Sequence, residues 1–170
     1  IVRNCKVRLQ NESSSSLEQL KERKLKWVEE MKESPIALVP EKANQQHYEV
    51  PPSFFDEVLG SNLKYSSGFW PQTVTTLNES ELAMLELSCE RAELENGQNI
   101  LELGCGWGSL TLWMAKKYPN SRITAVSNSA NLKTFIDEQC KILQINNITI
   151  LTSDMNEFQI EGRYDRIVSV

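Results

Sequence analysis

Glu102-Leu-Gly104-Cys-Gly106-Trp-Gly108-Ser109 is the stretch that decides the fold, because its glycines separate a short apolar run from a helical pattern. Residues 100–103 predict a buried strand, and apolar side chains then recur at helical spacing until Pro119 ends the pattern. Glycines supply the unusual backbone angles of a tight turn and let a ligand approach the main chain. The first amides of the following helix point into the same space, so this turn is the first candidate for a binding site.

Beyond this turn, strand and helix patterns alternate to the end of the sequence. Further strands are predicted at 122–126, 147–151 and 164–170, with helical patterns between the first three strands. This alternation is typical of a parallel sheet with right-handed crossovers and helices on both faces. The expected fold class is therefore a doubly wound, Rossmann-like α/β domain.

The chain is expected to divide near residue 78. Residues 79–170 would form the N-terminal part of the α/β domain, and residues 1–78 a helical and loop segment that caps the ligand site. The first dozen residues show no clear period, whereas a helix is predicted from Leu17 to about Ser34-Pro35. Asn78 and Glu81 have the spacing of a capping box at the start of a later helix.

Composition narrows the classes of function. The 170 residues carry a net charge of −5, which makes nucleic acid a poor default partner. No apolar run approaches the roughly 18 to 20 residues that a membrane span needs. The 4 cysteines are far apart and there is 1 histidine, so neither a metal site nor a disulfide scaffold is expected. Reduced thiols in the cytoplasm are the simplest interpretation.

The spacing of the glycines distinguishes between ligands. Dinucleotide-binding turns use G-x-G-x-x-G with an acidic residue about 20 positions further on. This sequence has G-x-G-x-G, and no carboxylate follows the second strand at Ser127-Asn-Ser129. A phosphate-cradling G-x-x-x-x-G-K-[ST] loop is also missing from the sequence. From the residues alone, a nucleotide-binding module without catalysis and an NAD-linked oxidoreductase remain alternatives.

Several motifs together resemble a known family. Residues 102–108 are similar to the first motif of class I S-adenosylmethionine-dependent methyltransferases. The larger set resembles the cyclopropane-fatty-acid-synthase-like family, and residues 85–92 and 126–130 are most similar to its coclaurine N-methyltransferase branch. The motifs of the larger set include His47-Tyr-Glu-Val-Pro51, Phe54-Phe55, Leu59-Gly60, Lys64-Tyr-Ser-Ser67, Thr76-Leu77, Gly104-Cys-Gly-Trp-Gly108 and Ser127-Asn-Ser129.

The resemblance implies S-adenosyl-L-methionine as cofactor and assigns residues to its two ends. The first group, at the amino-acid end and the glycine turn, is Tyr65, Ser66, Glu102, Gly104, Gly106 and Gly108. The second group, facing the ribose and adenine, is Ser127, Asn128, Ser129, Asp154 and Met155. Leu132 stands where the family usually has glutamine, and Met155 where some members have tryptophan. The plain alternatives are an exposed strand-end carboxylate at Glu102 and a turn role for Asp154.

The implied activity is methyl transfer to a small-molecule amine. The alternative within the family is cyclopropanation of unsaturated phospholipid chains, under which a membrane lipid becomes the partner; the acidic charge disfavours it. A Glu-His segment would follow the fourth strand in the resembled family, so no catalytic residue is assigned here. Because the sequence ends in the apolar run before Val170, we expect a fragment that is inactive by itself.

Overall fold

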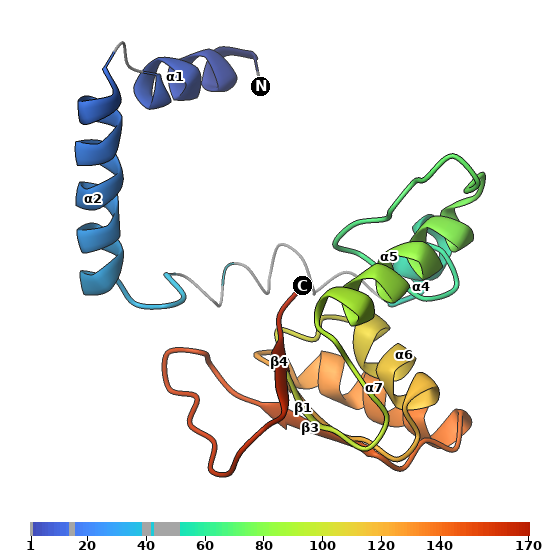
Figure 1. Cartoon of the computed structure of the whole chain (residues 1–170). Helices are drawn as coiled ribbons and strands as arrows, with labels where there is room; N and C mark the ends of the chain where they lie inside the picture. Colours follow the sequence, from blue (N-terminus) through green and yellow to red (C-terminus); the bar gives the residue numbers. More distant parts are fainter. Residues whose placement is uncertain (1, 14–15, 39–41, 43–51) are drawn as a thin grey trace. The chain divides into compact units, whose positions relative to one another are not determined.

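The computed structural model describes residues 2–13, 16–38, 42 and 52–170. It divides into two compact units, Ile1–Leu38 and Val39–Val170 (Figure 1). Residues 52–78 thus belong to the same unit as the sheet, while a capping role for residues 1–78 stays a prediction.

The described residues of the first unit form two helices. The predicted helix is α2 (Leu17–Glu33), which ends at Ser34 before Pro35. The residues before it form α1 (Val2–Glu12), which the sequence pattern did not reveal. None of the α2 residues is buried, and ion pairs one turn apart, such as Lys26–Glu30, support its exposed surface.

The second unit is built on a parallel sheet of four strands in the order β3-β2-β1-β4. Its strands are β1 (Asn99–Leu103), β2 (Arg122–Ser127), β3 (Ile148–Thr152) and β4 (Arg166–Val168). The chain moves outward from β1 to β3 and then returns to the other side of β1, where Glu102 pairs with both Ala125 and Val168. Strand order therefore reverses at β1, and ligands of open α/β sheets bind at such points.

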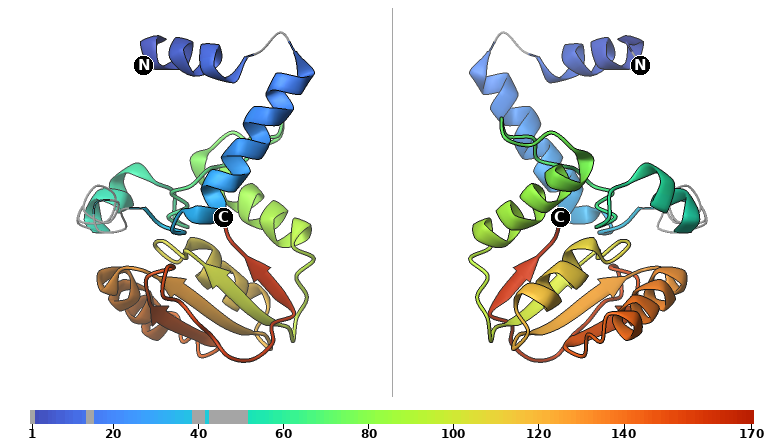
Figure 2. Two further views of the ribbon diagram at one scale, coloured as in Figure 1. Left: turned by 90° about the vertical axis from the view of Figure 1, so that its left-hand side faces the viewer. Right: turned by 90° about the vertical axis from the view of Figure 1, so that its right-hand side faces the viewer.

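Among the described helices of this unit, α5 (Leu77–Arg91), α6 (Ser109–Lys117) and α7 (Ala130–Ile142) lie on one side of the sheet (Figures 1 and 2). A shorter helix, α4 (Pro52–Val58), packs Phe55 against Trp107 and Leu132 near the starts of α6 and α7. Ile100 and Ile123 of the strands pack with Leu85 of α5 and Met114 of α6 in one core cluster. These side chains are almost fully buried, which makes apolar burial the main force that joins the layers.

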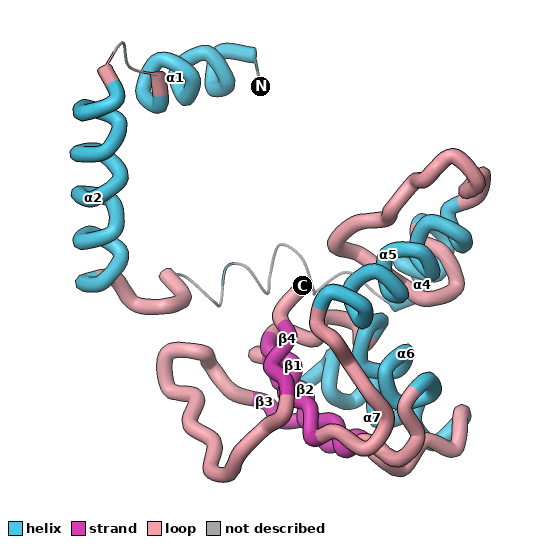
Figure 3. Tube along the Cα trace, viewed as in Figure 1, coloured by secondary structure: helices cyan, strands magenta, loops and turns pink. Residues whose placement is uncertain are grey.

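The opposite side of the sheet carries an irregular connection. The segment from 153 to 165 joins β3 to β4 there without a helix (Figure 3). The predicted Rossmann-like sheet is confirmed, whereas the described residues contain no helix on this second face.

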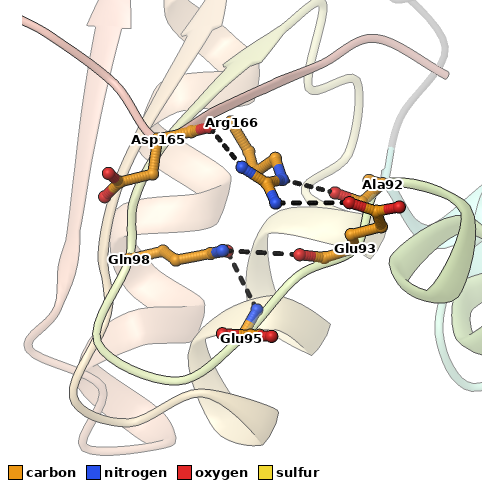
Figure 4. Close-up of polar contacts among 6 residues, drawn as sticks. All are labelled: Ala92, Glu93, Glu95, Gln98, Asp165 and Arg166. Atoms are coloured by element: carbon orange, nitrogen blue, oxygen red, sulfur yellow. Dashed lines mark hydrogen bonds and ion pairs between the residues drawn. The ribbon is translucent and has the colours of Figure 1, made fainter.

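Arg166 joins β4 to the end of α5. Its guanidinium donates to the carbonyl oxygens of Ala92 (2.9 Å) and Asp165 (2.8 Å) and lies 3.5 Å from the Glu93 carboxylate (Figure 4). Gln98 closes the neighbouring loop, since its side chain accepts from the Glu95 amide (2.9 Å) and donates to the Glu93 carbonyl oxygen (3.4 Å). The edge strand is thereby held against the helix layer.

The capping box of α5 lies two residues before the predicted one. Thr76 is the N-cap: its side chain accepts from the Glu79 amide, and the Glu79 carboxylate accepts from the Thr76 amide. The prediction of Asn78 with Glu81 was therefore wrong. Both side chains instead accept hydrogen bonds from the loop 60–64.

Gly108 is required by packing between α6 and α7. It is the N-cap of α6 with φ +79°, and a Cβ there would lie 2.7 Å from Cγ1 of Ile136 on α7. Close approach of a helix start to its neighbour is the usual role of the last glycine in such a turn.

We expect Gly108→Ala to destabilise the protein more than Gly97→Ala does. Gly97 also has a positive φ (+99°), but nothing lies within 4 Å of its Cβ position. Both variants incur the left-handed penalty of about 1–2 kcal/mol, and Gly108→Ala adds an overpacking cost of about 1–3 kcal/mol. Urea denaturation measures both free energies of unfolding.

A double-mutant cycle with Ile136→Ala identifies the cause. The double variant should lose less stability than the sum of the two single variants, because the clash needs both side chains. Equal costs for Gly108→Ala and Gly97→Ala, or strict additivity in the cycle, would contradict this role of Gly108.

Candidate functional site

A cavity of about 80 Å³ opens at the carboxyl end of β1. It brings together Tyr65, Ser66, Glu102, Gly104 and Gly106 from the sequence prediction. Cavities that hold whole ligands usually measure about 300–1,000 Å³, so this one has room for only part of such a ligand. The other lining residues are Leu63, Lys64, Cys105, Trp107, Ser109, Leu110 and Val170.

Gly104 and Gly106 form an open cradle on the wall of this cavity. Their φ angles are +80° and +51°, and no atom lies within 4 Å of either Cβ position. The space that side chains would fill is therefore free for a ligand that lies against the main chain. Gly108, whose Cβ position is blocked by Ile136, does not line the cavity.

Glu102 is a buried carboxylate, not an exposed strand-end residue. It is 4% exposed and accepts a 2.5 Å hydrogen bond from the hydroxyl of Thr111 on α6. Burial raises its pKa to about 7, although the Thr111 hydrogen bond and the charge of Lys64 lower it. Near neutral pH this group can therefore gain or lose a proton as its surroundings change.

Glu81 holds the loop that completes the cavity. Its carboxylate accepts from the backbone amides of Gly60 (2.8 Å), Asn62 (3.0 Å) and Lys64 (3.3 Å). The side chain is 1% exposed, so these bonds replace the water that a buried carboxylate would otherwise need. The loop is thus fixed to the first turns of α5.

Lys64 brings a buried cation to the same cavity. It is 6% exposed, and its Nζ donates to Ser66 Oγ at 2.7 Å. Burial lowers its pKa, while the charges of Glu81 and Glu102 act in the opposite direction. One ammonium and one carboxylate, Lys64 and Glu102, therefore line one small cavity.

Aromatic rings pack around Trp107 in the glycine turn. The Trp107 ring lies 4.9 Å from Phe55 of α4 and 5.2 Å from Phe135 of α7, measured between centroids. Trp107 is 3% exposed, so its indole packs between these two rings inside the protein. Cys105 is also buried, which raises the pKa of its thiol to about 12 and makes it a poor nucleophile at neutral pH.

The predicted ribose and adenine residues lie outside the 80 Å³ cavity, at the ends of β2 and β3. Ser127 is buried at the strand end, and its Oγ accepts from the Ser129 amide at 3.2 Å. Ser129 is the N-cap of α7 and accepts from the Leu132 amide, while Asn128 is exposed between the two serines. Contacts of these three residues with a cofactor stay a prediction.

Asp154 and Met155 follow β3 and are half-buried. One Asp154 carboxylate oxygen accepts from the Asn156 amide at 2.8 Å, which is the turn role considered from sequence. Because the carboxylate has further acceptor sites, this bond leaves a contact with adenine open. The Ser153 amide donates to the Ser127 carbonyl oxygen at 2.9 Å, so the loops that follow β2 and β3 lie at the same edge of the sheet.

Sequence reasoning missed the polar residues that support the site. Lys64 was quoted as part of a motif without a role, Glu81 was assigned to a cap, and Thr111 was not considered. For Glu81, its position one turn before Leu85 on the apolar face of the helix was the available signal. His47 lies outside the described residues.

A glycine turn of this kind at the reversal point of such a sheet belongs to the class I S-adenosylmethionine-dependent methyltransferase fold. More narrowly, the chain belongs to the mycolic acid cyclopropane synthetase family, whose model matches residues 39–170.

Relatives and solved structures agree with this placement. The chain is 44% identical over 140 residues to (S)-coclaurine N-methyltransferase of Thalictrum flavum subsp. glaucum, covering 82% of this chain and 39% of that protein. A crystal structure of coclaurine N-methyltransferase bound to N-methylheliamine and SAH matches with TM-score 0.92 and 37% identity, over 98% of this chain and 48% of that one. The mycolic acid cyclopropane synthase CmaA1, complexed with SAH and CTAB, matches with TM-score 0.67 and 26% identity, over 77% and 46%. The chain thus spans less than half the length of these proteins.

Other kinds of site receive no support from the described residues. None of their His, Cys, Asp and Glu side chains forms a group of three that could hold a metal ion. Cys5, Cys89, Cys105 and Cys140 are free thiols. No helix in the described ranges has both the length and the apolar character needed to cross a membrane.

We expect Glu81→Gln to destabilise the protein by about 2–4 kcal/mol. The glutamine side chain has one acceptor oxygen, whereas the three backbone N–H groups of the loop now donate to two carboxylate oxygens. The exposed Glu90 on the same helix provides the matched control, and Glu90→Gln should change stability by less than about 0.5 kcal/mol. Chemical denaturation checks both values. A cost of Glu81→Gln no larger than that of Glu90→Gln would show that the carboxylate does not hold the loop.

Stability should fall with rising pH because of Glu102. Its folded pKa of about 7 exceeds the ordinary value of 4.5, so the folded state binds more protons between these values. Relative to Glu102→Gln, the wild type should lose about 3 kcal/mol of unfolding free energy between about pH 4.5 and 7. Denaturation curves at pH 5 and pH 8 give the unfolding free energies of the wild type and of Glu102→Gln. If the difference between the two proteins is the same at both pH values, the prediction is refuted.

Proposed function

We propose that the protein is an S-adenosyl-L-methionine-dependent N-methyltransferase that acts on a small-molecule amine. The observation that carries this proposal is the open cradle of Gly104 and Gly106 in the cavity that Lys64 and Glu102 also line. The main chain there accommodates a ligand, and the two opposite charges complement the ammonium and carboxylate of an amino-acid group. Similarity to coclaurine N-methyltransferase supports the amine as acceptor.

Different groups of the predicted site residues would hold different portions of the cofactor. Glu102 would face the ammonium of the methionine portion, with Tyr65 and Ser66 near its carboxylate. Gly104 and Gly106 would lie against the chain that leads to the ribose. Ser127, Asn128, Ser129, Asp154 and Met155 would hold the ribose and adenine along the carboxyl edge of β2 and β3. When bound, the cofactor supplies a methyl group activated by the sulfonium charge.

The chain's own contribution to the reaction is positioning. The cradle fixes one reactant, so that an acceptor bound beside it meets the methyl carbon in line. An amine acceptor must present its lone pair in the neutral form. A small-molecule acceptor and a cytoplasmic location belong to the same proposal.

Calorimetric titration of the purified chain with S-adenosylhomocysteine and with NAD tests the cofactor. We expect binding of S-adenosylhomocysteine and none of NAD, because the turn lacks the dinucleotide spacing. Gly106→Ala should weaken S-adenosylhomocysteine by about 10-fold or more, since its Cβ enters the cradle at φ +51°. Gly162→Ala is the control. Gly162 also has a positive φ (+105°) but does not line the cavity, so the substitution should leave the affinity for S-adenosylhomocysteine unchanged. Binding of NAD alone would overturn the proposal.

The acceptor class needs an activity measurement on a protein that spans the length of the relatives, because the chain covers 39% of (S)-coclaurine N-methyltransferase. With methyl-labelled cofactor, we expect label in coclaurine and none in vesicles of unsaturated phospholipid. Label in the vesicles alone would instead establish cyclopropanation, the alternative that the family name and the match to CmaA1 keep open.

A further inference from the structure

The burial of Lys64 costs free energy, and general folding rules do not explain why a lysine lies at this position. A buried lysine must be compensated by partners, and Lys64 is 6% exposed, with its Nζ donating to the Ser66 hydroxyl at 2.7 Å. The residue before it, Leu63, has φ +49°, a left-handed conformation that is unfavourable for leucine. Such strain is commonly found where the surrounding structure serves a site.

The backbone around Lys64 is held from both sides. Its own amide donates to Glu81 at 3.3 Å, and the Tyr65 amide donates across it to the Leu63 carbonyl oxygen at 3.0 Å. This second bond spans three residues and forms a γ-turn centred on Lys64. The side chain of Lys64 is therefore directed by a fixed backbone.

The bond from Lys64 to Ser66 determines which way the serine hydroxyl can act. An ammonium donates and never accepts, so Ser66 Oγ is the acceptor in this 2.7 Å contact. The hydroxyl hydrogen must then point elsewhere, and the cation polarises it toward an acceptor. Because Ser66 and Lys64 both line the cavity, an acceptor bound there is well placed to receive that hydrogen.

We propose that Lys64 is a positioning residue that fixes the Ser66 hydroxyl as a hydrogen-bond donor to the carboxylate at the amino-acid end of the cofactor. This inference rests on the proposed function, since it needs a cofactor with such an end. Glu102 on the same cavity wall complements the ammonium of the same group. Lys64 thereby selects ligands that carry an amino-acid portion over ligands that share the nucleoside but lack it.

The test compares S-adenosylhomocysteine with 5′-methylthioadenosine, which has the nucleoside and sulfur but no amino-acid end. Lys64→Met should weaken binding of S-adenosylhomocysteine by about 10- to 100-fold and leave 5′-methylthioadenosine within about 2-fold of wild type. The control Lys141→Met removes an exposed lysine of α7 and should change neither affinity. Equal weakening of both ligands by Lys64→Met, or no weakening of either, overturns the proposal.

Ser66→Ala provides a second variant if Lys64→Met does not fold, because Ser66 is exposed. It should show the same selective loss for S-adenosylhomocysteine, and Lys64→Arg should restore part of the affinity that Lys64→Met removes. An unselective effect of Ser66→Ala overturns the proposal equally. Failure of the wild type to bind either ligand would instead refute the proposed function itself.

Discussion

The cavity depends on the hydrogen bonds that the Glu81 carboxylate accepts from the loop 60–64. Without them, nothing in the sheet would determine where that loop lies, because it precedes α5 and shares no strand pairing with β1. A carboxylate suits this task, since it accepts several amide donors at once and stays compact. The bonds bring Lys64, Tyr65 and Ser66 to the glycine turn, so a residue on a packing helix determines the shape of the ligand site.

Features that oppose stability are concentrated around this cavity. Glu102 and Lys64 are buried ionisable groups, and Leu63 is a left-handed residue that no helix end explains. Glu93 and Gln144 also have positive φ, but each directly follows the last turn of a helix, where this conformation is common. Departures from consistent folding rules are expected at functional sites. Their coincidence at one cavity is thus an independent physical reason to place function there.

The sheet could be predicted from sequence because its information is local. Each strand is a short β-branched or apolar run, and the connections from β1 to β2 and from β2 to β3 carry a helical period, so the parallel direction of these strands follows from general rules. The second face could not be predicted in the same way. The segment 153–165 takes the place of a crossover helix, and the rule that expects helices there describes the average domain. The helix α1 was missed because its residues show no clear apolar period in the sequence, whereas α2, which is equally unburied, shows one.

The site shows a sharper division. The glycine turn was predicted because its chemistry is visible in the residues themselves, whereas the Tyr65-Ser66 pair was predicted from the resemblance to a known family. Glu81 and Thr111 were not, because their roles arise from contacts across 17 to 21 positions in one case and 9 in the other. The same spacing that suggested a capping box at Asn78 and Glu81 is what places both side chains beside the loop: residues three apart share a helix face. A face that is not needed to cap a helix is free to bind another segment, and here that segment carries the cavity's buried cation.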